Sequence, residues 1–158
     1  MATNKQHALK LYKTLVGMMD AKDMKYDKKE EDLLVLSGFK TDDFPVEFFI
    51  RLDAERDLAV FMSKLPFSMP EDKRVDGAIA VCVANNGMVN GSFDYDVSTG
   101  DIWFRLITTF SGDMDLSQEA FEYIIHVAVG TIDKYNDRFF MLSKGMMNIQ
   151  EFIEKDVA

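Results

Sequence analysis

Cysteine, histidine and proline are scarce in this chain of 158 residues. Cys82 is the only cysteine, which excludes an internal disulfide and a zinc site built from several cysteines. The two histidines, His7 and His126, lie in no local catalytic signature, and we expect His126 to be a structural residue on the flank of a helix. No phosphate-binding loop, nucleophile elbow or zinc-protease helix motif occurs in the sequence. We therefore predict no catalytic residue and no cofactor, and we do not expect an enzyme.

Acidic residues in the second half of the chain have a spacing that superficially resembles a calcium-binding loop. Counting from Asp94, Thr99 stands where an EF-hand needs its turning glycine. Arg105 stands where the EF-hand needs its bidentate glutamate. We interpret these carboxylates as turn and strand residues, and we predict no metal site.

Long apolar runs and an excess of positive charge are missing as well. No segment approaches the roughly 18 uncharged apolar residues of a membrane-spanning helix. The first residues lack the apolar core of a signal peptide, and the single cysteine suits a reducing compartment, so we expect a cytoplasmic protein. Lysine and arginine number 18 against 27 aspartates and glutamates, and the net charge of −9 repels nucleic-acid backbones. Neither a membrane nor a nucleic acid is an expected partner.

The apolar residues that are present suffice for a folded core. Hydrophobic residues make up 47% of the sequence, and 158 residues correspond to about one domain. No internal repeat, low-complexity tract or linker divides the chain. We predict a single domain that covers residues 1–158.

Three segments show the spacing of amphipathic helices, with apolar residues every three or four positions. They cover about residues 4–21, 68–85 and 115–145. A last short helix is expected near residues 149–153. For the second helix, the spacing predicts an inward stripe formed by Val75, Ala78, Ile79 and Cys82.

Alternation of apolar and polar residues indicates strands with one buried face. We expect strands at about residues 33–40, 44–53 and 57–65, of which the last two form a hairpin. A second hairpin covers residues 90–108, and the charged loop over residues 22–32 has room for a short strand. The residues expected to face the helices are Val46, Phe48, Ile50, Leu52, Leu58, Val60, Met62, Phe93, Tyr95, Ile102, Phe104 and Leu106.

The second hairpin has the clearest register. Its four-residue loop ends at Gly100, which supplies the positive φ of the turn. This loop places Tyr95 opposite Ile102. Two residues further from the turn, Phe93 lies opposite Phe104. Together the elements predict an α+β fold with the order α-β-β-β-α-β-β-α, in which one antiparallel sheet carries helices mainly on one face.

Three short segments carry a resemblance to a known family: Gly91-Ser-Phe-Asp-Tyr-Asp, Gly100-Asp-Ile-Trp-Phe-Arg and Leu116-Ser-Gln-Glu. Through them the region from Asp72 to Leu142 resembles the YbjN family, bacterial proteins described as sensory transduction regulators. The resemblance implies a fold similar to that of the type III secretion chaperones. These are compact α+β proteins that commonly form homodimers and hold unfolded segments of exported partners. It implies no catalytic residue, because the matching segments form a hairpin and a helix start.

Five large apolar residues are expected on the sheet face that points away from the helices: Phe49, Phe61, Leu65, Trp103 and Ile107. An exposed patch rich in aromatic residues is typical of an interaction surface. The other possibility is that the last helix, or the Met18–Met19 edge of the first helix, covers these residues. We predict that they bind a protein partner or peptide segment in a homodimeric chaperone-like or regulatory adaptor. The alternative function is a small-molecule sensor or an enzyme with a pocket between sheet and helices.

Overall fold

The computed structural model describes the backbone of residues 2–157 and the side chains of residues 4–156. The elements are α1 (Ala2–Ala21), β1 (Tyr26–Lys29), β2 (Leu34–Phe39), β3 (Val46–Asp53), β4 (Leu58–Ser68), α2 (Arg74–Asn85), β5 (Ser92–Tyr95), β6 (Asp101–Thr109), α3 (Gln118–Ser143) and α4 (Ile149–Val157). The predicted α+β class and the predicted order of the main elements are confirmed. The short strand β1 and the last helix α4 are added to that order.

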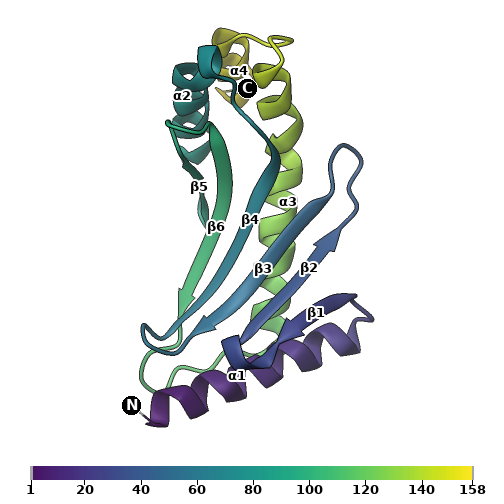
Figure 1. Cartoon of the computed structure of the whole chain (residues 1–158), viewed down its shortest axis with the longest axis vertical. Helices are drawn as coiled ribbons and strands as arrows, with labels where there is room; N and C mark the ends of the chain where they lie inside the picture. The colour runs from purple at the N-terminus through teal and green to yellow at the C-terminus, as the bar shows by residue number, and fades with distance from the viewer. Residues whose placement is uncertain (1, 158) are drawn as a thin grey trace.

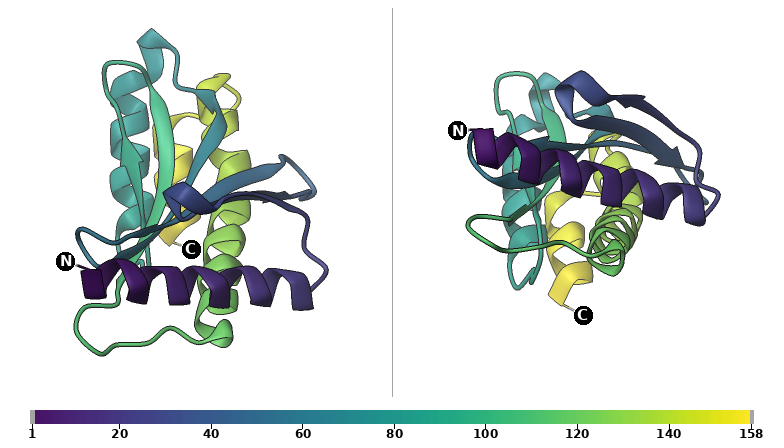
Figure 2. Two further views of the ribbon diagram at one scale, coloured as in Figure 1. Left: turned by 60° about the horizontal axis from the view of Figure 1, so that its bottom comes forward. Right: turned by 90° about the horizontal axis from the view of Figure 1, so that it is seen from below.

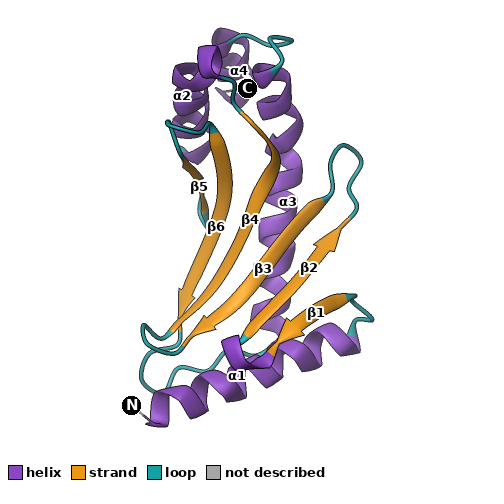
Figure 3. Cartoon of the chain, in the orientation of Figure 1, coloured by secondary structure: helices purple, strands orange, loops and turns teal. Residues whose placement is uncertain are grey.

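The strands form one antiparallel sheet in the order β1-β2-β3-β4-β6-β5. Helix α3 runs behind the sheet in Figure 1 and contacts β3, β4 and β6. Helix α1 crosses one end of the sheet, where it contacts α3 and β3. The view from below in Figure 2 also shows α3 on one side of the sheet, and Figure 3 distinguishes the strands from the helices behind them. We call the face toward α3 the inner face and the opposite one the outer face.

The inner face and the helices share the hydrophobic core. Phe93 connects the two layers, because its ring packs edge-on against Phe104 of β6 at 5.3 Å and Phe139 of α3 at 5.1 Å between centroids. Full burial of a side chain of this size contributes roughly 1.5–3 kcal/mol. The largest fully buried side chains include Tyr12, Phe61, Phe104, Phe110, Phe121, Phe139 and Phe152.

The hairpin of β5 and β6 has the predicted register. Tyr95 pairs with Ile102, and Phe93 pairs with Phe104. Gly100 has a φ of 78°, and a Cβ atom at this position would overlap the carbonyl oxygen of Met69. Glycine is therefore required here both by the backbone conformation and by the close approach of Met69.

In the hairpin of β3 and β4, the side chains of β4 point to the opposite faces from those predicted. Asp53 pairs with Leu58 across a turn formed by residues 54–57. Paired residues share a face, and Asp53 lies on the outer face because its neighbour Leu52 is buried on the inner face. The inner residues of β4 are Ala59, Phe61, Ser63 and Leu65, and its outer residues include Leu58, Val60 and Met62. The prediction for β4 was wrong because apolar residues occupy both alternating sets, so the turn alone decides the register.

Helix α2 buries a different face from the predicted one. Val75 is 71% exposed and Ile79 is 41% exposed, and Cys82 is also exposed. The predicted inward stripe is therefore wrong for these three residues, which we call the α2 stripe. The buried residues of this helix are Gly77, Ala80, Val81 and Ala84. Small side chains are buried because α2 lies close to β5, with which it is in contact.

Helix α3 is the longest element, with 26 residues. Ser117 caps its start, since the hydroxyl of Ser117 accepts a hydrogen bond from the backbone N–H of Ala120 at 3.1 Å. The helix ends at Ser143, two residues before Gly145, whose φ is 70°. Over the described part of the chain, no helix is both long and apolar enough to cross a lipid bilayer.

Candidate protein-binding surface

The outer face of the sheet carries an apolar patch, in which Arg51 and Arg105 are interspersed. Alternate residues of four neighbouring strands build it, because the register places their side chains on the same face. We call these residues the outer patch: Leu34, Leu36, Phe49, Val60, Met62, Trp103 and Ile107.

Cross-strand pairs hold the outer patch together. Leu36 pairs with Phe49, and Phe49 pairs with Met62 on the next strand. Met62 in turn pairs with Arg105, so Trp103, two residues earlier in β6, lies diagonally beside Met62. Directly paired residues have Cβ atoms about 4.5–5.5 Å apart, and diagonal neighbours are within reach of large side chains. The aromatic and aliphatic groups therefore form one surface rather than isolated exposed residues.

The outer patch is open to solvent. Leu36 is 39% exposed and Ile107 is 41% exposed. Four further members are half-buried, namely Leu34, Phe49, Met62 and Trp103, and Val60 is buried with 8% exposure. Neighbouring side chains on the same face cover part of each of these residues, and the rest of each side chain is exposed to solvent.

Neither the last helix α4 nor the Met18–Met19 edge of α1 covers the outer face. Helix α4 packs against α2 and α3, on the helix side of the sheet. Met18 is buried, and the groove that it lines also borders α3. Among the described residues, the outer patch therefore has the exposure of a free surface.

Two ion pairs lie beside and within the outer patch along β6. Arg105 Nη2 lies 3.0 Å from Asp94 Oδ1. Lys64 Nζ lies 2.9 Å from Asp101 Oδ2, and the same amine is 6.0 Å from the centre of the Trp103 ring. These charged groups are partly exposed and contribute little to stability. Lys64 and Asp101 lie at the border of the outer patch, whereas Arg105 lies within it, between Trp103 and Ile107 on β6 and opposite Met62.

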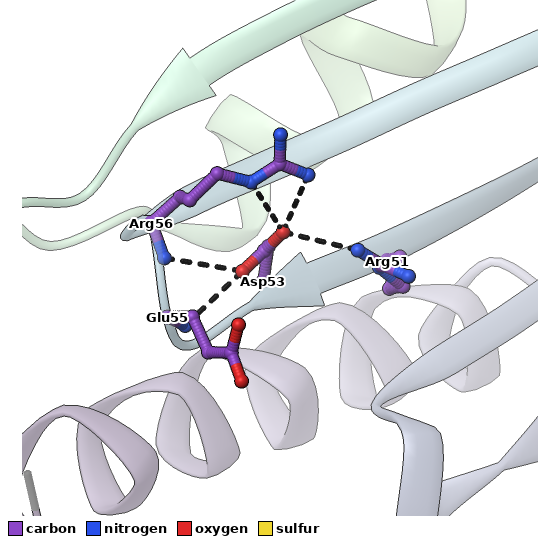
Figure 4. A network of polar contacts seen from close by, with 4 residues as sticks. All are labelled: Arg51, Asp53, Glu55 and Arg56. Atoms are coloured by element: carbon purple, nitrogen blue, oxygen red, sulfur yellow. Dashed lines mark hydrogen bonds and ion pairs between the residues drawn. The ribbon is translucent and has the colours of Figure 1, made fainter.

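Asp53 organises the turn at the end of the outer face (Figure 4). Its Oδ2 accepts hydrogen bonds from Arg51 Nη2 at 3.0 Å and from Arg56 Nε at 2.8 Å. Its Oδ1 accepts from the backbone N–H groups of Glu55 and Arg56, each at 3.1 Å. Burial alone would raise the pKa of Asp53, but the hydrogen bonds from Arg56 and Arg51 outweigh burial and lower the pKa to about 2. This carboxylate holds the β3–β4 turn and has its hydrogen-bonding capacity filled by the chain itself.

The structure separates the five residues predicted for partner binding into two groups. Phe49, Trp103 and Ile107 lie on the outer face, and their role in binding stays a prediction. Phe61 and Leu65 do not lie on the outer face, because they are 1% and 3% exposed and belong to the inner face of β4. Sequence reasoning missed other members of the outer patch, above all Leu36, Val60 and Met62.

The β5 edge of the sheet offers less room for an added strand. The side-chain amide of Asn85, at the end of α2, donates to the carbonyl of Phe93 at 2.9 Å. Its carbonyl oxygen accepts from the backbone N–H of Phe93 at 2.8 Å. Asn85 thereby takes the place of a neighbouring strand at this position. The outer patch is a larger unpartnered surface than this edge.

The residues that could carry reaction chemistry are dispersed over three elements. His7 lies on α1, where its ring packs edge-on against Phe110 at 5.4 Å. His126 lies exposed on α3, and Cys82 lies exposed on α2. Within the described residues, no group of three or more histidine, cysteine or acidic side chains is arranged to hold a metal ion.

Comparison with known protein families and with curated proteins finds no match for this chain. Solved structures with a similar fold do exist. A chain of the HopA1–SchA chaperone–effector complex superimposes with a TM-score of 0.51 and 11% identity, over 80% of this chain and 94% of that one. A chain of the ExsC–ExsE complex superimposes with a TM-score of 0.53 and 14% identity, over 81% of this chain and 92% of that one.

YbjN from E. coli, described as a proposed transcription regulator, is a third structural neighbour. It superimposes with a TM-score of 0.57 and 12% identity, over 78% of this chain and 87% of that one. The likeness in fold that the sequence resemblance implied is therefore confirmed, both for YbjN and for chaperone–effector complexes. At such low identity, the likeness establishes the fold alone.

Proposed function

We propose that this chain is a non-catalytic protein-binding module, a chaperone-like or regulatory adaptor of the cytoplasm. The observation that carries the proposal is the outer patch, an aromatic and aliphatic surface of four strands that no described helix covers. Contiguous exposed surfaces of this kind mark interaction sites in soluble proteins. The fold likeness to a chain of a chaperone–effector complex supports a protein as the partner.

The outer patch suits an extended or amphipathic segment of the partner. Phe49 and Trp103 supply large aromatic surfaces, and residues of these types carry much of the binding energy in protein interfaces. The ion pair of Lys64 lies at the border of the patch and that of Arg105 lies within it, and charged groups of this kind favour correct orientation more than affinity. The partner is therefore expected to place apolar side chains on the patch and polar groups near these ion pairs.

The test is affinity capture from the cytoplasm in which the chain naturally occurs, with three tagged baits. They are the wild-type chain, Trp103→Asp and the control Val97→Asp. Val97 is 58% exposed in the turn of the same hairpin and lies outside the outer patch. Replacement of a large aromatic contact such as Trp103 by a charge costs about 2 kcal/mol or more, roughly a 30-fold loss of affinity. We expect a stoichiometric partner with the wild type and Val97→Asp, and none with Trp103→Asp.

Far-UV circular dichroism of the three baits must be the same for this result to count. Capture of the same partner by all three baits would contradict a binding role for the outer patch. Capture of no specific partner by the wild type would contradict the adaptor function itself.

We further propose that the chain forms a homodimer through the α2 stripe. Val75, Ile79 and Cys82 lie one turn apart on one face of α2, and all three are exposed. A two-fold axis beside this face would bury the stripe of each copy against that of the other. The outer patch would stay free for a partner in such a dimer.

Light scattering and crosslinking test the dimer. We expect Ile79→Asp to be monomeric, while the control Val89→Asp, at a position that is 93% exposed just beyond α2, keeps the wild-type mass. A short bismaleimide should link two wild-type copies through Cys82, the only cysteine of the chain. A monomeric wild type at all concentrations, or a dimeric Ile79→Asp, would contradict this interface.

A further inference from the structure

A groove of about 440 Å³ opens on the inner side of the sheet, between α3, the end of α1 and the β2–β3 hairpin. One face of α3 forms a wall of the groove with Glu122, Ile125, His126, Val129, Gly130 and Asp133. The 11 residue steps from 122 to 133 correspond to about 16 Å along the helix axis. This length accommodates an extended segment of about five residues.

The middle of the groove is apolar and open. Ile125 and Val129 line it from α3, and Met18, Met24 and Phe39 line it from the other elements. Phe39 is 36% exposed, although it pairs with Val46 of the neighbouring strand β3. At position 130, a Cβ atom would meet no heavy atom within 4 Å. Apolar side chains of a bound segment therefore have both a lining and free space here.

Carboxylates crowd one end of the groove. Asp133 lines the groove, and Oδ1 of Asp133 is buried without a hydrogen-bond partner in the described chain. Desolvation, and then the negative charges of Asp137, Asp133 and Asp42, raise the pKa of Asp43 in the β2–β3 loop. Among the described residues, none of these four carboxylates takes part in an ion pair. This end of the groove therefore presents acidic groups that a cation of a ligand could contact.

Aromatic packing fixes the acidic loop against α3. The Phe44 ring lies 4.9 Å from the Phe140 ring of α3, and 5.4 Å from the Phe67 ring at the end of β4. Phe44 directly follows Asp43 in the chain. The carboxylates of the loop are thus held close to those of the helix although like charges repel.

An ion pair lines the opposite end of the groove. Lys22 Nζ lies 2.9 Å from Glu122 Oε1, so the carboxylate at this end has a cation of its own. The two ends therefore differ in charge, and a bound segment would take one direction along α3.

We propose that this groove binds a peptide segment of the partner protein in which a lysine or arginine lies next to apolar side chains. The apolar side chains occupy the space beside Gly130, and the cation reaches the carboxylates around Asp133. This inference rests on the proposed protein-binding function and adds a second contact surface on the other side of the sheet from the outer patch. A basic segment also matches the net charge of −9 of the whole chain.

The test uses a phage-displayed library of random peptides of about ten residues, twice the span of the groove. Selection is made on the tagged full chain, and enriched peptides are synthesised with a fluorescent label. Their affinity is then measured by anisotropy for the wild type, Gly130→Leu, Gly130→Ala, Asp133→Asn and Trp103→Asp. Gly130→Leu fills the groove, whereas Gly130→Ala alters the same position and leaves most of the space free. Asp113→Asn, an exposed carboxylate outside the groove, is the control for charge.

We expect the enriched peptides to share a basic residue next to apolar ones. Gly130→Leu should weaken their binding about tenfold or more, and Asp133→Asn several-fold. Asp113→Asn should bind as the wild type does, and Gly130→Ala should weaken binding less than Gly130→Leu does. Unfolding curves identify any variant that has lost its fold. If Gly130→Leu does not fold, the Asp133→Asn variant decides the result, because asparagine has nearly the same shape as aspartate.

Four outcomes would overturn the inference: no enriched peptide, enriched peptides without basic residues, unchanged binding by both Gly130→Leu and Asp133→Asn, or a change of oligomeric state in Gly130→Leu. The last would make the groove a contact between copies of this chain. Peptides that lose affinity only for Trp103→Asp would reject the groove and leave the proposed function intact. Peptides that lose affinity only for Gly130→Leu and Asp133→Asn would support the groove whatever the fate of the outer patch.

Discussion

Asp53 is a residue whose sequence context gives little hint of its role. It stands at the end of β3, and its carboxylate accepts hydrogen bonds from two arginines and two backbone N–H groups. These contacts fix the turn that sets the register of β4. The register in turn decides which residues of β4 join the outer patch, so a buried carboxylate controls the composition of the proposed binding surface.

Replacement of Asp53 by asparagine should lower the free energy of unfolding by about 1.5–3 kcal/mol at neutral pH, because the charged hydrogen bonds are lost. The folded pKa of about 2 lies below the ordinary aspartate value. The contribution of Asp53 is therefore fully present above about pH 4 and is lost as the pH falls toward about 2. Urea unfolding of both proteins along this pH range measures the difference. A gap between the two proteins that stays constant down to the lowest pH would contradict the assigned hydrogen bonds.

Individual residues of the outer patch were predictable where the strand alternates cleanly or the register is fixed by a short turn. Trp103 and Ile107 were predicted correctly because the β5–β6 turn fixes Tyr95 opposite Ile102. Phe61 and Leu65 were assigned to the wrong face because β4 is apolar at nearly every position. For such a strand, the hydrophobic pattern cannot decide between two registers that differ by one residue.

At the scale of elements, α2 and α3 use glycine for opposite purposes. In α2, a Cβ atom at Gly77 would lie 2.6 Å from the hydroxyl of Tyr95 and 2.7 Å from Cγ of Met69. The same hydroxyl donates to the carbonyl of Arg74 at 2.8 Å. In α3, a Cβ atom at Gly130 would have open space around it. The first glycine allows close packing, and the second leaves a groove unfilled.

Alanine substitutions at these two positions should therefore have opposite effects on stability. Gly130→Ala should raise the free energy of unfolding by about 0.5–1 kcal/mol, because alanine is the better helix former. Gly77→Ala should lower it by about 1–3 kcal/mol, because the overpacking against Tyr95 and Met69 exceeds that gain. Chemical denaturation of the two variants gives both numbers. A stabilising effect of Gly77→Ala would show that α2 and β5 are less closely packed than the structure has them.

The error in the predicted face of α2 has the same physical origin. Valine, isoleucine and cysteine at Val75, Ile79 and Cys82 have the spacing of a buried stripe, so hydrophobicity alone favours them for the core. The close approach of β5 instead selects the small residues of the opposite face, including Gly77 and Ala80. Such a requirement for small size depends on a tertiary contact and leaves no periodic signal in the sequence.

At the scale of the whole molecule, three surfaces of different character surround one core. The outer patch lies on one face of the sheet, the groove lies on the other face beside α3, and the α2 stripe lies away from both. The order of elements and the similarity in fold were predictable, because alternation, helical spacing and the hairpin residues are local signals. The groove was not, since its lining comes from α1, the β2–β3 loop and α3, which are far apart in sequence and which only the fold brings together.

Fluorescence of Trp103 is the measurement that tests the proposed protein-binding function most directly. Trp103 is the only tryptophan of the chain and lies on β6 at one side of the outer patch, diagonally beside Met62. In the free protein, the half-buried indole should be quenched by acrylamide. When the captured partner is added to saturation, the account predicts that quenching falls and that the emission maximum moves to shorter wavelength. A partner without tryptophan, or one with its tryptophans replaced by phenylalanine, keeps the signal specific. Unchanged quenching and emission at saturation would contradict the claim that the outer patch is the surface on which the partner binds.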